Sequence, residues 1–346
     1  MNNRAYGRPI FATTVGDFGD ADYAACARQI PVPSRLDRLP REPFSPLDEL
    51  KLFARVLRAA WTERLLVLFG SRGNLKPELL AIVAIGLLPQ RFRPGIVLHG
   101  DMYQPNTGLR GMLERLVLRF ADRAIDRYTV QSAAEADIIS RHWGIDRRKL
   151  NVVYVTYHPN ATIKQLASAP RGQHIFAGGD SFRDFEPLVE AARMLPEYQF
   201  VIGTKRLEGR TDLPPNMQAR VLSPSDYLKY MSTAAAVVVP LKKGLQRSAG
   251  QTTYQQSMWL KKLTIVTDAL AVREYVEDGV TGLVVDGSPE SYVSAIRWAF
   301  DPNNASTIVQ IGEQAYARVK ESADRNTRTQ SLLRIVNEVA AERNFT

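Results

Sequence analysis

Two short segments of this 346-residue chain carry side chains suited to chemistry at the ends of expected β-strands. In the first, a short apolar run ends in Gly178 and Gly179, and Arg183 follows four residues later. Glycines at the turn from a strand into a helix leave backbone amides open to a phosphate, and an arginine can bind that phosphate through two parallel hydrogen bonds. The segment therefore predicts a phosphate site, and the alternative is a surface arginine beside Asp180 and Asp184.

The second segment is His99-Gly100-Asp101, which closes the apolar run 95–99. Ligands of parallel sheets bind beyond the carboxyl ends of the strands, so we expect His99 and Asp101 to face a binding site. Asp101 can act as a general base toward a hydroxyl group. A single histidine is more often structural, and that alternative stays open for His99. Spacing typical of metal ligands is not found among the other histidines, which are His142, His158 and His174.

The elements that must position these segments are read from short apolar runs that alternate with helical patterns. Strands are expected at 64–69, 95–99, 128–131, 151–155, 174–177, 199–203, 235–240 and 263–267. Helices are expected at 47–62, 76–88, 109–126, 133–143, 186–194, 227–232 and 254–260. Alternation at this spacing indicates right-handed crossovers and mostly parallel sheets.

The pattern restarts after a mostly polar segment, 157–172, which contains two prolines. The chain is longer than one usual domain of roughly 100–200 residues. We therefore predict an α/β protein of two doubly wound, Rossmann-like domains, residues 1–165 and 166–346, whose last helix is a candidate to pack back on the first domain. The cleft between two such domains is the expected binding site.

Composition excludes several classes of protein. Apolar residues make up 45% and charged residues 23% of the chain, as in ordinary globular domains. The single cysteine excludes a disulfide framework and a cysteine-based zinc site. Neither a run of roughly 20 apolar residues nor an N-terminal signal core is present, which predicts a cytoplasmic protein. Dinucleotide, P-loop and zinc-protease motifs are also absent, and the pair Asp20 and Asp22 is of a kind that arises by chance in most chains.

The net charge of +9 is concentrated in the first half of the chain, where residues 1–165 hold 24 Lys and Arg against 16 Asp and Glu. This excess predicts an anionic partner. Nucleic acid is not expected, because no recognition module is found. Basic residues recur on two expected amphipathic helices, at Lys51, Arg55 and Arg58 and at Arg115, Arg119, Arg123 and Arg127. Either they form a solvated face, helped by pairing with Asp122 and Asp126, or they contact anionic lipid headgroups.

The segment Arg247–Asp286 resembles the donor-binding region of GT-B glycosyltransferases, especially the retaining bacterial transferases of family 4. The matching signature is a glycine-containing loop, a helix ending in Met258, a strand, and then an acidic-Gly-x-Thr-Gly-apolar run, here Asp278–Val285. Phe176-Ala177-Gly178-Gly179 resembles the start of the family's donor domain. Asp122–Gly144 resembles the helix-strand-helix that closes its first domain.

This resemblance implies a metal-independent enzyme that transfers a sugar from a nucleoside-diphosphate sugar, without a further cofactor, to a glycan or lipid-linked acceptor. A peripheral position on the inner face of the cell membrane is compatible with it. In the family a basic pair holds the diphosphate, which here would be Arg183 with Lys205 or Arg206. His99 would bond the donor sugar. The remaining donor contacts that it implies are Leu222, Ser223, Ser248, Ala249, Gly250, Gln251, Thr252 and Gln256.

The sequence departs from the family at one motif. The family pattern has two glutamates eight positions apart, and alignment on Met258 places Ser248 and Gln256 at those positions. Gln256 can still bond ribose hydroxyls, but the carboxylate that faces the sugar is missing. Retaining and inverting outcomes both stay open. A non-catalytic sugar-nucleotide-binding or assembly protein on the same fold is the alternative function.

Overall fold

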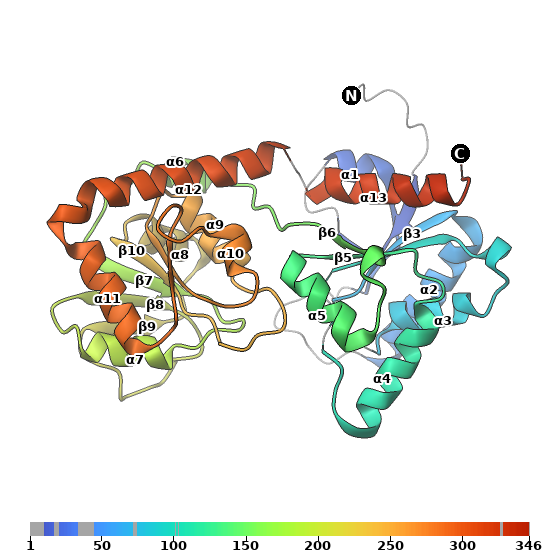
Figure 1. Ribbon diagram of the computed structural model, residues 1–346, viewed down its shortest axis with the longest axis horizontal. Coiled ribbons are helices and arrows are strands. Elements are labelled where there is room, and N and C mark those ends of the chain that lie inside the picture. Colours follow the sequence, from blue (N-terminus) through green and yellow to red (C-terminus); the bar gives the residue numbers. More distant parts are fainter. Residues whose placement is uncertain are drawn as a thin grey trace. The chain divides into compact units, whose positions relative to one another are not determined.

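The chain folds into two compact units in a computed structural model that describes residues 10–16, 21–33, 45–71, 75–100, 102, 104–325 and 328–345 (Figure 1). One unit comprises Met1–Tyr154 with Arg328–Thr346, and the other comprises Val155–Thr327. The division falls before the boundary expected at 165 and 166, because Val155 and Tyr157 are hydrogen-bonded to side chains of the second unit. The last helix contributes its contacts to the first unit.

The first unit contains a six-stranded parallel sheet in the order β2-β1-β3-β4-β5-β6. Its strands are β1 (Phe11–Thr13), β2 (Ala27–Gln29), β3 (Leu65–Phe69), β4 (Gly95–His99), β5 (Arg127–Val130) and β6 (Leu150–Val152). Its helices are α1 (Ala21–Cys26), α2 (Pro46–Thr62), α3 (Pro77–Gly86), α4 (Gly108–Ala121), α5 (Ala133–Trp143) and α13 (Arg328–Glu342), with short 3₁₀ turns at Gln90–Phe92 and Arg147–Lys149.

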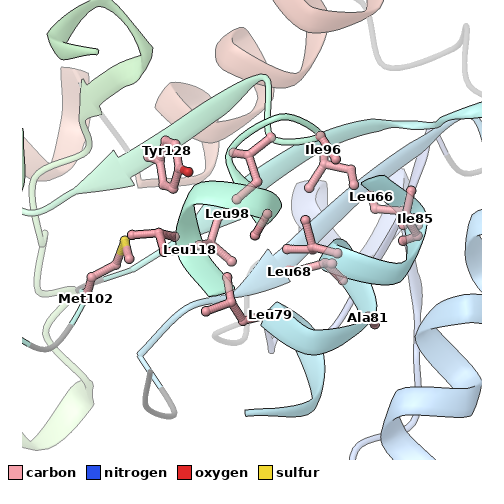
Figure 2. Packing of buried hydrophobic residues seen from close by; sticks show 14 of the residues in the cluster. Leu66, Leu68, Leu79, Ala81, Ile85, Ile96, Leu98, Met102, Leu118 and Tyr128 are labelled. Atoms are coloured by element: carbon pink, nitrogen blue, oxygen red, sulfur yellow. The ribbon is translucent and has the colours of Figure 1, made fainter. Parts of the chain in front are cut away.

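Alternation along the central strands builds two cores in the first unit, one on each face of its sheet. Leu66, Leu68 and Leu98 point toward α2, α3 and α4, where Leu118 of α4 packs beside them (Figure 2). Val67 and Val97 belong to the opposite core, which α1 and α13 cover. Each face of the sheet is therefore sealed by helices, as a parallel sheet requires.

The second unit contains another six-stranded parallel sheet, in the order β12-β11-β10-β7-β8-β9. Its strands are β7 (His174–Gly178), β8 (Gln199–Gly203), β9 (Met217–Arg220), β10 (Ala236–Val239), β11 (Thr264–Thr267) and β12 (Leu283–Val285). Its helices are α6 (Ala161–Leu166), α7 (Glu186–Arg193), α8 (Pro224–Ser232), α9 (Gln251–Trp259), α10 (Val272–Tyr275), α11 (Pro289–Phe300) and α12 (Ala305–Arg325), with a 3₁₀ turn at Pro302–Asn304. Helices α7 and α11 pack on one core, and α8, α9 and α10 pack on the other.

The expected strands are present, and the structure adds four that the apolar runs did not indicate. β1, β2, β9 and β12 have only three or four residues each, which is too short for a clear alternation. The helix expected at 109–126 ends at Ala121, so Arg127 lies in β5 and the prediction that it continues the arginine series of that helix was wrong. None of the helices in the described part of the chain combines the length and apolar character that a membrane span requires.

Candidate functional site

The site is built around the carboxyl end of β7, the central strand of the second sheet. β7 lies between β8 and β10, so the chain runs outward in opposite directions on its two sides. In doubly wound sheets this switch point is where ligands bind, beyond the carboxyl ends of the two strands. The loops that follow β7 and β10 are joined there by backbone hydrogen bonds, from the Asp184 amide to the Pro240 carbonyl at 2.9 Å and from the Lys242 amide to the Phe182 carbonyl at 3.0 Å.

Arg183 places a buried positive charge at this switch point. Its side chain is buried, with 5% of the residue exposed. The guanidinium donates from Nε to the Gly178 carbonyl at 3.1 Å, from Nη1 to the Ser181 carbonyl at 2.9 Å and from Nη2 to Thr253 Oγ1 at 2.9 Å. All three acceptors are neutral, and the Asp180 carboxylate acts on the guanidinium electrostatically without a hydrogen bond to it among the described contacts.

Burial is the largest influence on Arg183 and lowers its pKa, because the charged form is poorly solvated there. Tyr227, Tyr254 and the Asp180 carboxylate partly offset this effect, and the charge of Arg206 adds to it. The usual pKa of arginine is so high that the group keeps its proton. A buried cation without a counter-charge is unfavourable by itself. An anion that reached this guanidinium would be strongly attracted.

The two glycines at the end of β7 make room for side chains of the unit itself. A Cβ on Gly178 would stand 2.4 Å from the ring of Tyr227, which also limits Gly203 on the neighbouring strand. Gly179 has φ +97°, and its amide donates to the Gly203 carbonyl at 3.0 Å. The sequence analysis expected these amides to face a phosphate, but the Gly179 amide is used inside the sheet. Tyr227 of α8 fills the space beside Gly178, and the Arg183 guanidinium lies beside Gly179, 3.1 Å from where a Cβ would stand.

Lys205 and Arg206 are the candidates for the second cation that binds the diphosphate, and both are exposed after β8. Asp180 connects them to the loop after β7. The Asp180 carboxylate accepts from Thr204 Oγ1 at 2.7 Å and from the Lys205 amide at 2.9 Å. The Arg206 guanidinium donates to the Asp180 carbonyl. The structure therefore brings Arg183 and Arg206 to the same strand ends, as two cations close enough to repel each other.

The expected donor loop leads into α9, whose first turn touches Arg183 through Thr253. Ser248, Ala249 and Gln251 are buried, whereas Thr252 is exposed and Gln256 is half-buried. Gly250 begins the helix with φ +83°, and a Cβ there would stand 3.1 Å from Leu241. The loop therefore lies beside the Arg183 guanidinium, at the same edge of the sheet.

Leu222 and Ser223, the expected base contacts, have structural roles in the second unit. The Leu222 side chain lies against Gly203, where a Cβ would be 2.9 Å away. Ser223 caps α8 by accepting from the Asp226 amide at 3.1 Å, and its hydroxyl donates to the Asp226 carboxylate at 2.8 Å. The motif Asp278–Val285 is likewise satisfied internally. Asp278 accepts from the Val284 amide at 2.8 Å, and Thr281 Oγ1 accepts from the Glu277 amide at 2.9 Å.

Sequence reasoning missed the side chains that hold the beginning of the second unit. Gln255 of α9 accepts from the Tyr157 amide and donates to the Val155 carbonyl, both at 2.9 Å. Trp259 donates to the Tyr157 carbonyl at 2.9 Å. A helix that follows the donor loop therefore also anchors the segment 155–157. The only sequence signal for this contact was that Gln255 is polar, and a single sequence does not reveal which backbone groups Gln255 binds.

In the first unit, His99 ends β4 as a buried and fully bonded imidazole. Its Nδ1 lies 2.7 Å from Thr129 Oγ1, and Arg328 of α13 approaches Nε2 with Nη2 at 2.5 Å and Nε at 3.2 Å. Because a guanidinium can only donate, Nε2 accepts and the proton is on Nδ1. Burial, followed by the charge of Arg328, holds the pKa of His99 well below its usual value. His99 is therefore neutral, and Asp101 beside it lies outside the described residues.

Comparison with solved structures identifies the fold. No family model and no curated protein matches the sequence. A glycosyltransferase from Rickettsia africae ESF-5 is similar over 96% of this chain and 90% of its own, with a TM-score of 0.67 and 13% identity. Anabaena Alr3699/HepE, solved in complex with UDP, is similar over 91% of this chain and 86% of its own (TM-score 0.64, 15% identity).

Sucrose-phosphate synthase (tll1590) from Thermosynechococcus elongatus is similar over 92% of this chain and 84% of its own, with a TM-score of 0.62 and 15% identity. Each likeness covers both units. Together with the two parallel sheets flanked by helices, they show the GT-B fold. The predicted fold class is therefore confirmed.

Proposed function

We propose that this protein transfers a sugar from a nucleoside-diphosphate sugar to an acceptor hydroxyl. The observation that carries the proposal is the buried guanidinium of Arg183, whose hydrogen-bond acceptors are all neutral, at the switch point of the second sheet. A diphosphate is the anion whose charge and size suit a buried arginine with a second arginine, Arg206, beside it. Uridine is the first nucleoside to test, since HepE was solved with UDP and with UDP-glucose.

In the proposed reaction, the bond between the sugar's anomeric carbon and the diphosphate oxygen breaks, and the acceptor oxygen bonds to that carbon. Negative charge develops on the departing diphosphate, where Arg183, with Lys205 or Arg206, would stabilise it. These cations would supply the charge for which other transferases use a metal ion. Asp101 would take the proton of the acceptor hydroxyl. His99 is assigned the donor sugar from its place at the carboxyl end of β4, and in the structure both of its ring nitrogens have partners within the first unit.

The finer assignment is to a family 4-like hexosyltransferase that works at the cytoplasmic face of a membrane on a lipid-linked or cell-envelope glycan. Its support is the sequence signature at 247–286 and the positive charge concentrated in the first half of the chain. Ser248 and Gln256 stand where the family has glutamates, which favours a second candidate, a sugar-nucleotide-binding protein without transferase activity.

The experiment is the release of free nucleotide from a panel of UDP-, GDP- and TDP-hexoses without acceptor. We expect slow hydrolysis of one donor by the wild type, lost in Arg183→Ala and retained in the exposed control Arg297→Ala. Binding of a donor without any release would favour the second candidate. Neither binding nor release of any donor in the panel would contradict both.

A further inference from the structure

Helix α4 of the first unit has a buried side that is well packed. Gly111, Glu114, Leu118 and Ala121 form this side, and Leu118 points into the core beside Leu98 and Met102 (Figure 2). The Glu114 carboxylate accepts from the Asn106 amide at 2.8 Å and from Asn106 Nδ2 at 2.6 Å. The loop before α4, which follows β4, is therefore fastened to the buried side of the helix.

The opposite side of α4 is apolar as well. The exposed fractions are 85% for Leu109, 65% for Met112, 50% for Leu113, 51% for Leu116 and 37% for Phe120. Their spacing of three and four residues places them on one face of the helix. We call these five residues the α4 face. A surface helix of a soluble domain normally carries polar residues there, and a continuous apolar face indicates an interaction surface.

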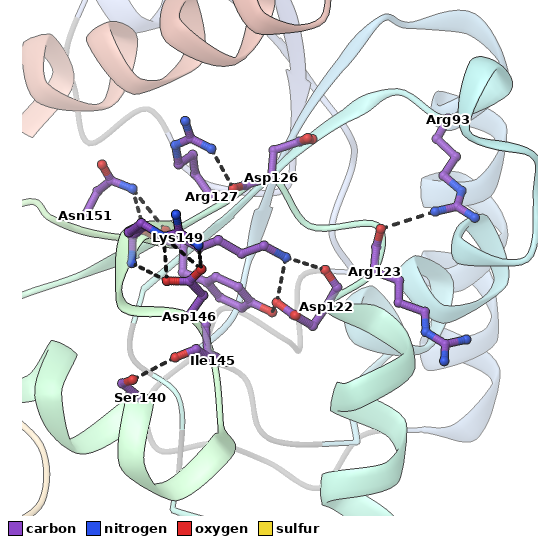
Figure 3. Close-up of polar contacts among 12 residues, drawn as sticks. Arg93, Asp122, Arg123, Asp126, Arg127, Ser140, Ile145, Asp146, Lys149 and Asn151 are labelled. Atoms are coloured by element: carbon purple, nitrogen blue, oxygen red, sulfur yellow. Dashed lines mark hydrogen bonds and ion pairs between the residues drawn. The ribbon is translucent and has the colours of Figure 1, made fainter.

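Exposed arginines border the α4 face. Arg115 and Arg119 lie on the same helix, and the Arg123 guanidinium stands 5.0 Å from the centre of the Phe120 ring. The nearest carboxylates in sequence are used elsewhere. Asp122 binds Lys149 at 3.0 Å and Tyr128 at 2.8 Å, as Figure 3 shows for Lys149, and Asp126 binds Arg343 at 2.7 Å.

The alternative left open by the sequence was a solvated face, helped by pairing of these arginines with Asp122 and Asp126. That pairing is not what the described contacts show. Arg127, the fourth residue of the expected series, lies in β5 and binds Glu342. The charge of Arg115, Arg119 and Arg123 is therefore available to an outside partner.

A second segment extends this surface. The backbone of Phe120 lies 3.4 Å from where a Cβ would stand on Gly86, so the end of α3 packs on the end of α4. Just beyond it, Leu87 is 79% exposed and Phe92 is 55% exposed. Arg93 fixes this segment by donating to the Arg123 carbonyl at 3.2 Å (Figure 3). Large apolar side chains and unpaired positive charge thus occur together on two neighbouring elements.

We propose that the α4 face lies in the interface of an anionic lipid membrane, with its apolar side chains at the acyl boundary and its arginines on lipid phosphates. A helix with one buried side cannot itself leave the domain, so it would bind as a surface anchor. Because Glu114 ties α4 to the loop after β4, the anchored helix would hold that loop at the lipid surface. The acceptor delivered there is a lipid-linked hydroxyl compound, an assignment that rests on the proposed function.

The test is flotation of the full-length protein with phosphatidylcholine vesicles that contain increasing phosphatidylglycerol. We compare the wild type with Met112→Ser/Leu113→Ser/Leu116→Ser and with Arg115→Gln/Arg119→Gln. The apolar variant should lose at least about tenfold in partition, because those side chains supply the buried area. Each arginine near an anionic surface contributes about 1 kcal/mol, so the second variant should lose about 30-fold at low salt. Matched controls are Val309→Ser and Arg297→Gln/Lys320→Gln, exposed positions on α11 and α12.

Loss of flotation in both α4 variants but not in the controls would support the proposal, provided that thermal unfolding shows all variants to be folded. Equal flotation of variants and wild type, or no flotation of the wild type at low salt, would overturn it. So would a wild-type dimer in sedimentation that the apolar variant abolishes without any vesicle binding. UDP binding in solution is measured in parallel and should be unchanged in the α4 variants. Vesicle binding without UDP binding would contradict only the proposed function, and UDP binding without vesicle binding would contradict only this inference.

Discussion

A buried basic side chain lies at the carboxyl end of β4 and another at the carboxyl end of β7, and the two differ in charge and in hydrogen-bond partners. At the end of β4, His99 is neutral and finds a partner for each ring nitrogen, in Thr129 and in Arg328. At the end of β7, Arg183 keeps its charge and meets only neutral oxygens. The first arrangement is complete without a ligand, whereas in the second no carboxylate is among the hydrogen-bond acceptors of the guanidinium. This difference is why we place the proposed anion site in the second unit.

The second unit contains its own control for this argument. Arg171 donates to the carbonyls of Ala235 and Ala299, and partial burial of its guanidinium lowers its pKa, although the residue as a whole is exposed and Arg183 is buried. However, Arg171 precedes β7 and bonds the residue before β10, so it lies at the amino ends of the strands. Two arginines with the same kind of acceptors thus stand at opposite ends of one sheet, and only the carboxyl end is a ligand site in such folds.

The largest expected effect separates these two arginines. Arg183→Gln should weaken UDP binding by more than about 100-fold, because charge-assisted hydrogen bonds contribute roughly 1.5–3 kcal/mol each. Arg171→Gln should leave the affinity for UDP unchanged while lowering the thermal stability. Titration calorimetry of both variants at one salt concentration measures the difference. Similar losses in the two variants would show that Arg183 acts through the stability of the unit.

A second prediction concerns the acceptor hydroxyl, whose proton Asp101 would take, rather than binding of the donor. Asp101→Asn should lower kcat by about 100-fold, the usual contribution of a general base, with an unchanged Kd for the donor. Asn is close to Asp in shape, so binding of the acceptor should be retained. Initial rates with saturating donor and acceptor provide the measurement. An unaltered kcat would remove Asp101 from the mechanism.

The glycines of β7 allow a prediction on stability. Gly178→Ala should lower the free energy of unfolding by about 1–3 kcal/mol, since the added methyl group would overlap the Tyr227 ring. Combining it with Tyr227→Leu should cost less than the two changes added together, because the smaller side chain frees the space. Urea unfolding of the two single variants and the double variant tests this coupling. Additive losses would mean that Tyr227 is not the reason for the glycine.

The smallest expected effect is a pH dependence of the free energy of unfolding that comes from His99. Burial and Arg328 hold the pKa of His99 well below its usual value, so below about pH 6.5 the unfolded chain takes up a proton that the folded chain does not. Stability should therefore fall as the pH drops from 6.5 to 5.5, by up to about 1 kcal/mol more in the wild type than in His99→Gln. Urea unfolding at both pH values measures this slope. The exposed control His158→Gln should keep the wild-type slope, and parallel slopes for wild type and His99→Gln would contradict the burial argument.

Much of the fold follows from local pattern, because runs such as Leu65–Phe69 and Gly95–His99 are long and apolar enough to be read as strands. Prediction from the sequence fails where a strand is too short to show a pattern, or where a contact joins residues far apart in the chain. β9 has four residues with mostly exposed side chains at the sheet edge. The fit of Tyr227 against Gly178, and the pairing of Asp126 with Arg343, join residues far apart in the chain. The strands and the residues at their ends could therefore be read from the sequence, but the partners of those residues could not.

A crystal structure of the protein with bound UDP would locate the diphosphate relative to Arg183. We expect a phosphate oxygen of the diphosphate within hydrogen-bonding distance of the Arg183 guanidinium, at the carboxyl end of β7, with Arg206 or Lys205 on the same diphosphate. UDP bound with its diphosphate away from Arg183, or no UDP in crystals grown at saturating nucleotide, would contradict it.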